Sequence, residues 1–240
     1  MENKFVSKLN VPSSFCDNTG KLGFVGAFNL FMDLATEHAK QIGVGGDVLR
    51  EKGCFWVVSK TRIRFKRHPK MTEEVTASTW PEKPKTIRYN RYYTIEDESS
   101  VIAEGKNEWA ILDMESGRPC KAADVYPVDM EHLEDKVCTE PFLRMSTDFA
   151  DCQELCKHRV ASSDIDMSKH MNNVAYVRAV LSAFTCDKLR EMNISEIEIH
   201  YRHQCYEGEV LSIRCRDAED FVEIGVIKPD GSCGAVLSIR

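Results

Sequence analysis

An internal duplication constrains the fold of this chain more than any other feature of its sequence. Residues 6–32 align without a gap on residues 155–181, each residue with the one 149 positions later. Thr19 aligns with Ser168, which keeps a hydroxyl at that position. A repeat of this length indicates a repeated structural unit. The identical pairs are Lys8/Lys157, Val11/Val160, Ser13/Ser162, Ser14/Ser163, Asp17/Asp166 and Val25/Val174.

Each copy begins as a short strand, continues as a polar loop and ends as an amphipathic helix. Apolar residues recur in each helix at three- and four-residue spacing, which is the pattern of a helix with one buried face. The residues in this stripe are Phe24, Phe28, Phe31, Ala35, His38 and Ile42 in the first copy, and Val174, Val177, Val180, Leu181 and Phe184 in the second.

Only strands are predicted after each helix. Residues 61–66 and 197–202 alternate between apolar and polar, as strands with one buried face do. Each half therefore reads β-α-β-β-β-β, an α+β unit. Because one helix cannot cover both faces of a five-stranded sheet, we expect each sheet to curl around its helix. The predicted strands span residues 54–67, 73–81, 86–96 and 101–113, and then residues 194–204, 208–216, 220–228 and 233–240.

The two units leave a segment between them that shows scattered charges and little periodicity. We therefore expect an N-terminal unit over residues 1–117, a linker over residues 118–150 and a C-terminal unit over residues 151–240. Because the duplication is covalent, a monomer is as plausible as a homodimer.

Composition excludes several classes of protein. The net charge of −6 argues against nucleic acid as a bulk partner, since such binding depends on neutralising phosphates. No stretch reaches the roughly 18 apolar residues of a membrane-spanning helix. The first residues, MENKFVSKLN, lack the apolar run of a secretory signal, so we expect a cytoplasmic protein. The ten cysteines are scattered without a CxxC pair, which indicates reduced thiols, and no metal or organic cofactor is indicated.

The polar loop before the second helix carries the residues with the clearest chemistry. Lys21 in the first copy stands where the second has His170, and Phe24 stands where it has Asn173. A site is therefore predicted in the second half, at a helix N-terminus whose free N–H groups favour an oxyanion. From spacing alone, a loop of turn and capping residues explains the same pattern. The polar residues are Asp164, Asp166, Ser168, His170, Asn172 and Asn173.

The segment SDIDMSKHMNNVAYV resembles the acyl-ACP thioesterase family, whose members show Asp-x-Asn-x-His-x-Asn-Asn-Val-x-Tyr at the start of the second helix. Residues 17–20, 35–39 and 43–45 are similar to the family's first helical region, and residues 201–205 to the strand that follows the second. The resemblance implies a tandem (double) hotdog fold. It also implies hydrolysis of the thioester of fatty acyl-carrier protein to free fatty acid and holo-ACP, with acyl-carrier protein as partner.

Carried over by this resemblance, the family's catalytic residues fall on Asp166 and His170. Its Asn is replaced by Ser168, and its acidic residue on the next strand by Gln204, while Cys205 matches a cysteine of the plant enzymes. Gln204 can orient water but cannot take a proton from it. Asp166 then becomes the general base, or the nucleophile through a mixed anhydride, and His170 orients water or substrate or assists proton transfer.

Two further groups of residues complete the predicted function. Backbone N–H groups of Met171, Asn172 and Asn173 are expected to stabilise the tetrahedral oxyanion. Acyl-carrier protein is acidic, so its docking calls for a basic patch, although a merely solvated face fits the same residues. The candidate patch consists of Lys60, Arg62, Arg64, Lys66, Arg67 and Lys70, which no acidic residue interrupts.

Three classes of function remain open at this point. The first is an acyl-ACP thioesterase with a single site in the second half. The second is an acyl-CoA thioesterase of the same fold. The third is a non-catalytic acyl-thioester-binding protein, which the changes at Ser168 and Gln204 make conceivable.

Overall fold

The computed structural model describes residues 3–126 and 131–240 and divides into two compact units, residues Met1–Glu140 and Pro141–Arg240. The segment expected as a linker is shared between them. Its described residues up to 140 belong to the first unit, and residues 141–150 belong to the second.

The first unit is a five-stranded antiparallel sheet in the order β1-β3-β4-β5-β2. Its main helix follows the first strand, so the expected β-α-β-β-β-β order is confirmed, and two short helices are added. The elements are β1 (Phe5–Asn10), α1 (Phe24–Gln41), α2 (Gly46–Glu51), β2 (Cys54–Phe65), β3 (Glu74–Pro81), β4 (Tyr89–Glu96), β5 (Val101–Asp113) and α3 (Ala122–Val125).

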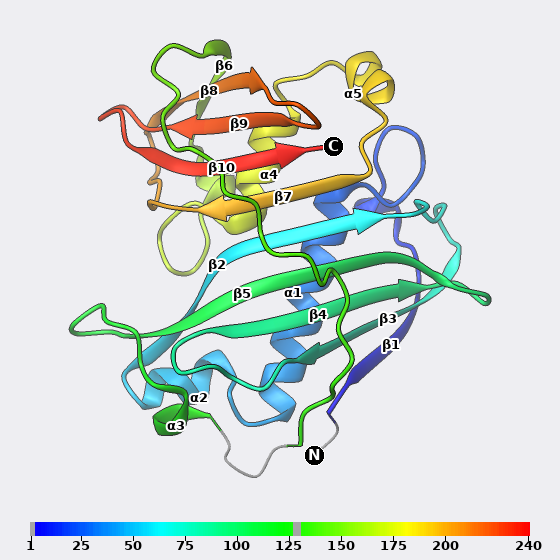
Figure 1. The fold of residues 1–240 in the computed structure, drawn as a ribbon, viewed down its shortest axis with the longest axis vertical. Coiled ribbons are helices and arrows are strands. Elements are labelled where there is room, and N and C mark those ends of the chain that lie inside the picture. Colours follow the sequence, from blue (N-terminus) through cyan, green and yellow to red (C-terminus); the bar gives the residue numbers. More distant parts are fainter. Residues whose placement is uncertain (1–2, 127–130) are drawn as a thin grey trace. The chain divides into compact units, whose positions relative to one another are not determined.

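Helix α1 lies across one face of this sheet (Figure 1). All the residues expected in its apolar stripe are buried, from Phe24 to Ile42. The sheet lies close to α1 at Gly105 of β5, where the Phe31 ring occupies the space of a side chain. Phe31 also stacks on Tyr93 of β4, with ring centroids 4.6 Å apart.

The second unit repeats this architecture in the strand order β6-β8-β9-β10-β7. Its helix is shorter than expected. It ends at Leu181, and Phe184 lies in the turn before a second short helix, which the side chain of Thr185 caps by accepting a hydrogen bond from Lys188 N. The elements are β6 (Gln153–Arg159), α4 (Asn173–Leu181), α5 (Cys186–Met192), β7 (Glu196–Tyr201), β8 (Val210–Asp217), β9 (Val222–Ile227) and β10 (Cys233–Ile239).

The duplication holds residue by residue in the backbone. Gly20 and Lys169, 149 positions apart, both adopt a left-handed conformation, with φ of +72° and +63°. Helices α1 and α4 begin 149 positions apart as well. The sequence alignment therefore located structurally equivalent residues. Other equivalent features are the 3-10 turns Ser13–Phe15 and Ser162–Asp164, and the bridges Cys16↔Leu22 and Ile165↔Met171.

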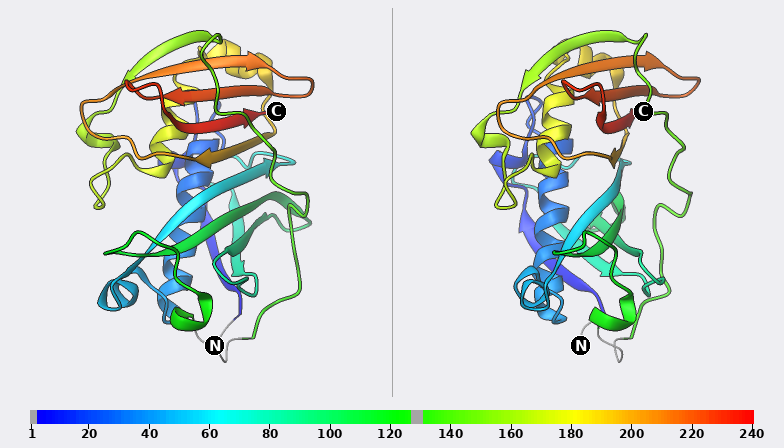
Figure 2. Two further views of the ribbon diagram at one scale, coloured as in Figure 1. Left: turned by 60° about the vertical axis from the view of Figure 1, so that its left-hand side comes forward. Right: turned by 90° about the vertical axis from the view of Figure 1, so that its left-hand side faces the viewer.

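The face of each sheet away from its helix is covered by residues of the segment that follows β5 (Figure 2). In the first unit, Trp80 donates through Nε1 to the carbonyl of Asp135 at 2.8 Å. In the second, Leu143 N donates to Glu198 at 2.7 Å, and Phe149 packs against Gly225. Both units are thus layered as helix, sheet and covering chain. Among the described helices, none combines the length and the apolar character needed to cross a membrane.

We expect Gly105→Ala to lower the free energy of unfolding by about 1–3 kcal/mol, because the new Cβ overpacks the interior. That Cβ would lie 2.4 Å from Cε2 of Phe31. Gly46→Ala in α2 is the matched control, since its Cβ would meet nothing within 4 Å. Urea unfolding measures both variants. Equal stability of the two would contradict the close approach of sheet and helix.

Candidate functional site

The site loop, residues 165–172, is a tight hairpin that leads into α4. Its two ends pair through the bridge between Ile165 and Met171, and Asp166 N donates to the carbonyl of His170 at 3.1 Å. Lys169 N donates to the carbonyl of Asp166 at 2.9 Å, and the left-handed Lys169 closes the turn. The loop therefore holds Asp166 and His170 opposite one another across a hairpin.

Asp166 has one carboxylate oxygen engaged and one available. Its Oδ1 accepts a hydrogen bond from Ser168 N at 2.8 Å, which forms an Asx turn. Its Oδ2 makes no hydrogen bond to any of the described residues. The side chain is half-buried, so one oxygen shapes the loop while the other is left to act as a base or nucleophile.

His170 is half-buried beside it, and its Nδ1 lies 3.3 Å from the carbonyl oxygen of Met171. A carbonyl only accepts hydrogen bonds, so this contact favours the tautomer with the proton on Nδ1. The lone pair of the neutral imidazole is then on Nε2. His170 can therefore accept a proton or a hydrogen bond through Nε2.

The helix N-terminus offers fewer free donors than expected. Met171 N donates to the carbonyl of Cys205 at 2.8 Å, and Asn172 N donates to the carbonyl of Asp164 at 2.7 Å. The expectation that these two N–H groups stabilise an oxyanion is therefore wrong, because the fold already uses both. The side chain of Asn172 caps α4 by accepting from Val174 N at 2.8 Å.

Asn173 is the donor that remains. It is the first residue of α4, and its N–H makes no hydrogen bond within the described part of the chain. The first N–H groups of a helix have no partner within the helix, so they favour negative charge nearby. A tyrosine hydroxyl fixes this residue, since Tyr201 donates to the carbonyl of Asn173 at 3.1 Å.

Residues 203–205 are fastened beside the site loop. Cys205 accepts from Met171, as described, and its N–H donates to the hydroxyl of Tyr176 on α4 at 3.1 Å. Gln204 is exposed, and its Oε1 accepts from the hydroxyl of Tyr206 at 2.8 Å. The backbone thus brings Gln204 next to the loop, but no hydrogen bond joins its side chain to Asp166 or His170.

Ser168 and Cys205 do not have the surroundings of nucleophiles. Ser168 is exposed at the turn, and no hydrogen bond connects its hydroxyl to His170. Cys205 is fully buried, and this burial raises the pKa of its thiol. A buried thiol with a raised pKa supplies little thiolate, so Cys205 acts as part of the core.

A second polar pair supports the entry to the loop: Asp164, already named among the polar loop residues, and His158, which the sequence reasoning did not single out. Asp164 is buried, and its Oδ2 accepts from Ala161 N and lies 3.0 Å from Nε2 of His158. The first copy has apolar Leu9 and Phe15 at the two equivalent positions. The signal in the sequence was that these two positions are polar in the second copy and apolar in the first. We infer from the contacts of Asp164 that it positions the loop.

The first unit contains the same loop with different side chains. Asp17 N donates to the carbonyl of Lys21 at 2.8 Å, and Thr19 N donates to Asp17 Oδ1 at 2.8 Å. The Asx turn is thus common to both units and does not by itself indicate chemistry. Only the second unit has an imidazole opposite the carboxylate, which supports a single site there.

The expected basic patch is largely neutralised by carboxylates from neighbouring elements. On β2, Lys60 pairs with Glu108 of β5 at 3.0 Å, and Arg64 pairs with Glu104 of β5 at 3.2 Å. These acids lie on the adjacent strand, so the uninterrupted run of cations in the sequence did not reveal them.

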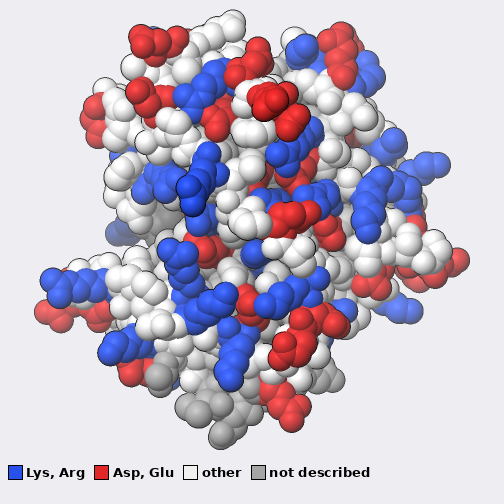
Figure 3. Space-filling view, in the orientation of Figure 1, with Lys and Arg blue, Asp and Glu red and all other residues white. Residues whose placement is uncertain are grey.

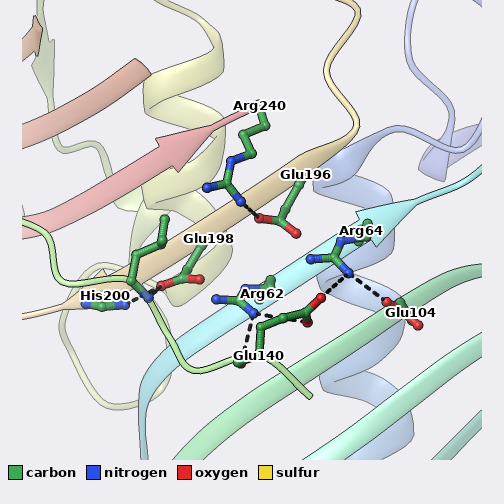
Figure 4. Close-up of polar contacts among 9 residues, drawn as sticks. Arg62, Arg64, Glu104, Glu140, Glu196, Glu198, His200 and Arg240 are labelled. Carbon is green, nitrogen blue, oxygen red and sulfur yellow. Dashed lines mark hydrogen bonds and ion pairs between the residues drawn. The ribbon is translucent and has the colours of Figure 1, made fainter. Parts of the chain in front are cut away.

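Two more arginines of the expected patch are paired in the same unit. Arg62 is buried, 2% exposed, and donates to the carbonyl of Glu140 at 3.1 Å (Figure 4). Arg67 binds Glu73 at 2.6 Å and Asp97 at 2.7 Å. These two acids hold the pKa of the Arg67 guanidinium above its usual range.

Of that patch, Lys66 and Lys70 are exposed and make no ion pair with an acid in the described residues, so a docking role for the six residues stays a prediction. On the face drawn in Figure 3, cations and anions are intermixed rather than separated. Among residues 3–126 and 131–240, no group of three or more His, Cys, Asp and Glu is placed to bind a metal ion, and the absence of a cofactor stays a prediction.

We expect alkylation to distinguish the buried thiol beside the loop from an exposed one. Cys186, at the start of α5, is exposed and should react first with iodoacetamide. Cys205 should stay unmodified until the protein unfolds, because its thiol is buried and its pKa is raised. Peptide mass spectrometry over a time course measures both. Modification of Cys205 at the rate of Cys186 would show that the segment beside the loop is open.

Comparison with known proteins agrees with this arrangement. The coriander (Coriandrum sativum) oleoyl-acyl carrier protein thioesterase is 23% identical over 231 residues, which is 88% of this chain. The chain spans 63% of that relative's length and about half the length of other curated relatives.

Solved structures show the same fold. An acyl-ACP thioesterase from Bacteroides thetaiotaomicron is 20% identical, with a TM-score of 0.89 over 99% of this chain and 97% of its own. The 12:0-ACP thioesterase from Umbellularia californica is 16% identical, with a TM-score of 0.82 over 100% and 97% of the two chains. These similarities confirm the tandem hotdog fold.

The two halves match the two domains of one family in order. The model of the acyl-ACP thioesterase N-terminal domain matches residues 2–127, and that of the C-terminal domain matches residues 150–228. With more than half of its length matched by the first domain alone, this chain belongs to the acyl-ACP thioesterase family.

Proposed function

We propose that this protein hydrolyses the thioester of fatty acyl-carrier protein and releases a free fatty acid and holo-ACP, as part of fatty acid biosynthesis. The observation that carries the proposal is the site loop. It holds the available Oδ2 of Asp166, the imidazole of His170 and the unpaired N–H of Asn173 at one helix N-terminus. Relatives within the family are named as acyl-ACP thioesterases, which favours acyl-ACP as the substrate.

Asp166 is the proposed general base. A water molecule attacks the thioester carbonyl carbon, and its proton passes to Oδ2, while Oδ1 keeps its bond to Ser168 N. The negative charge that develops on the carbonyl oxygen is stabilised by the N–H of Asn173. If Asp166 is instead the nucleophile, it forms a mixed anhydride, which hydroxylamine would trap.

His170 is the proposed second group in proton transfer. Its Nε2 is free when Nδ1 faces the carbonyl of Met171. Collapse of the tetrahedral intermediate breaks the C–S bond, and the leaving thiolate takes a proton to give the thiol. The proton that Asp166 took from water passes to Nε2 of His170, and the imidazole then donates it to the sulfur.

The surface around the site loop supports an acidic protein partner. Lys169, in the turn of the loop, is exposed and is not ion-paired with an acid in the described residues. Met167, at the tip of the loop, is 79% exposed and offers an apolar contact. A cation beside an exposed apolar residue is complementary to an acidic carrier protein. This contact is proposed in addition to the candidate docking patch within residues 60–70.

The experiment that tests the function measures fatty acid release from acyl-ACPs of C8 to C18 chains and from the matching acyl-CoAs. We expect faster turnover of the ACP forms, with a rate that falls as ionic strength rises, because salt screens the docking charges. Faster turnover of the acyl-CoAs would identify CoA, rather than acyl-carrier protein, as the carrier of the acyl group. Saturable binding of acyl-ACP without release would identify a binding protein and overturn hydrolysis.

We expect Asp166→Asn to lower kcat/KM by about 10²–10⁴-fold, the usual contribution of a general base. The asparagine keeps an Oδ1 that accepts from Ser168 N, so the loop retains its turn. The matched control is Asp17→Asn, which changes the same turn in the first unit and should leave turnover unchanged. Equal rates in the wild type and Asp166→Asn would remove Asp166 from the mechanism.

A location in the cytoplasm and a monomeric or homodimeric state belong to the same proposal. Ten cysteines remain free thiols, which is typical of a reducing compartment. Analytical ultracentrifugation distinguishes the two oligomeric states.

A further inference from the structure

A buried carboxylate lies at the entry to the site loop, and groups from three segments of the second unit converge on it. Asp164 is 6% exposed, and its Oδ2 accepts from Ala161 N at 3.0 Å and lies 3.0 Å from Nε2 of His158 on β6. Its Oδ1 lies 3.9 Å from Nη1 of Arg178 on α4. An ionised carboxylate only accepts hydrogen bonds, so the contact with His158 places a proton on Nε2. The loop support, defined by Asp164, Ala161, His158 and Arg178, thus links the entry of the loop to β6 and to α4.

The first unit builds the same loop backbone without these polar groups. Its 3-10 turn closes when Phe15 N donates to the carbonyl of Pro12 at 3.0 Å. The second unit closes its turn in the same way, with Asp164 N on the carbonyl of Ala161 at 2.9 Å. The carbonyls of Phe15 and Asp164 each accept from the N–H of the residue before the main helix, at 3.1 and 2.7 Å. The backbone of the loop therefore does not depend on the side chain of residue 164.

The polar groups of the loop support are replaced together in the first copy. There, the side chain of Leu9 has no donor, Pro12 has no N–H, and the side chain of Phe15 has no acceptor. These three residues stand at the positions of the imidazole, the N–H and the carboxylate. Asn29 stands at the position of Arg178. A buried ion pair adds little stability over apolar residues of similar volume, because burial removes the hydration of its charges. The polar version of the loop is therefore not explained by the fold.

The position of residue 164 affects both arms of the site loop. Asp166 follows it by two residues on the first arm. On the second arm, Asn172 follows His170 by two residues, and its N–H donates to the carbonyl of Asp164 at 2.7 Å. Hydrogen bonds are directional, whereas apolar contacts allow small shifts. Catalytic groups need positions fixed to a fraction of an ångström, and the loop support provides directional contacts at the base of both arms.

From this comparison of the two units, we propose that the loop support fixes the site loop in the geometry that hydrolysis needs and that the shared backbone alone does not provide. Asp164, His158 and Arg178 are then positioning residues, which act through Asp166 and His170 and do not touch the substrate. The inference rests on the proposed function and deepens it. Because these residues do not bind the substrate, their loss lowers kcat and leaves KM nearly unchanged.

The main test gives the second unit the residues of the first. The double variant His158→Leu/Asp164→Phe replaces the polar pair by the apolar residues of the first copy, so its melting temperature should stay close to that of the wild type. We expect its kcat for acyl-ACP hydrolysis to fall by between about tenfold and a hundredfold, with KM nearly unchanged. A double variant that keeps the kcat of the wild type would overturn the inference.

Two single variants test the hydrogen bond itself. His158→Gln keeps an N–H donor close to the position of Nε2, whereas His158→Leu removes it. We expect kcat to stay closer to that of the wild type in His158→Gln than in His158→Leu. Equal losses of kcat in the two variants would contradict a role for the hydrogen bond.

A matched control separates positioning from stability. His200 lies 2.7 Å from Glu198 in another buried pair of an imidazole and a carboxylate, on the sheet face that Leu143 and Phe142 cover. His200→Leu should lower the melting temperature as His158→Leu does, because each leaves a buried carboxylate without its imidazole, but it should leave kcat unchanged. A loss of kcat in His200→Leu equal to that in His158→Leu would assign the effect to stability and overturn the inference.

Amide hydrogen exchange tests the inference without turnover. In the wild type, the N–H groups of Ser168 and Lys169, which bond Asp166, should have higher protection factors than those of Thr19 and Gly20 at the equivalent positions. The double variant should remove this difference. Higher protection in a wild type that does not hydrolyse thioesters would support the inference while the proposed function fails. Turnover by a wild type whose two loops are equally protected would overturn the inference and leave the proposed function intact.

Discussion

A sheet of five strands has two faces, and the main helix of each hotdog unit covers only one of them. The remaining face is covered by the chain that follows β5. Charged residues that point to this face are therefore buried and need partners there. In the second unit, Glu198 is fully buried on that face and accepts from Leu143 N, with Nε2 of His200 2.7 Å away. Polar residues on the covered face therefore serve to hold the covering chain.

The same constraint explains the fate of the basic residues of β2. Arg62 is buried because Glu140 lies over it, and Arg64 contacts both Glu140 and Glu104 (Figure 4). Cations that read as one exposed row in the sequence thus neutralise acids within the unit. Little unpaired positive charge is thus left on β2, whereas the exposed Lys169 of the site loop makes no ion pair with the described acids.

The two units share the backbone of the loop but differ in the side chains that it carries. Asp17 and Asp166 make the same Asx turn, so a carboxylate at this position has a structural use in both units. The second unit adds His170 opposite Asp166 and Asp164 at the entry to the loop, where the first unit has Lys21 and Phe15. The two units therefore share the backbone of this loop, and the proposed catalytic side chains occur together only in the second.

Much of this arrangement could be predicted from the sequence, because it depends on local patterns. The strand ranges follow from alternation, and the aligned copies placed the left-handed Lys169 at the position of Gly20. The occupied donors of the helix N-terminus could not be predicted. Met171 N and Asn172 N bind carbonyls of Cys205 and Asp164, and no sequence pattern reveals which carbonyl a loop N–H will meet.

The break after Leu181 was missed for a related reason. The apolar spacing continues to Phe184, but Thr185 caps a new helix and ends the first, so the local cap prevails over the periodic pattern. The paired charges of β2 were missed because their acids lie on another strand or far along the chain. Local sequence patterns predict the helices and strands. Which polar groups remain free depends on contacts between those elements, which local patterns do not show.

Because residue 204 is a glutamine, fewer acidic groups are present at the site to share the steps of proton transfer. Gln204 is neutral and its Oε1 accepts from Tyr206, while Asp164 is occupied by Ala161 N and faces His158. Asp166 is consequently the carboxylate of the site loop with an oxygen to spare. The described site loop thus offers no second free carboxylate, so in the proposed mechanism the proton of the attacking water passes to Asp166 or to His170. In the proposed mechanism the imidazole returns it to the leaving thiolate, because Nε2 of His170 can first accept a proton and then donate it.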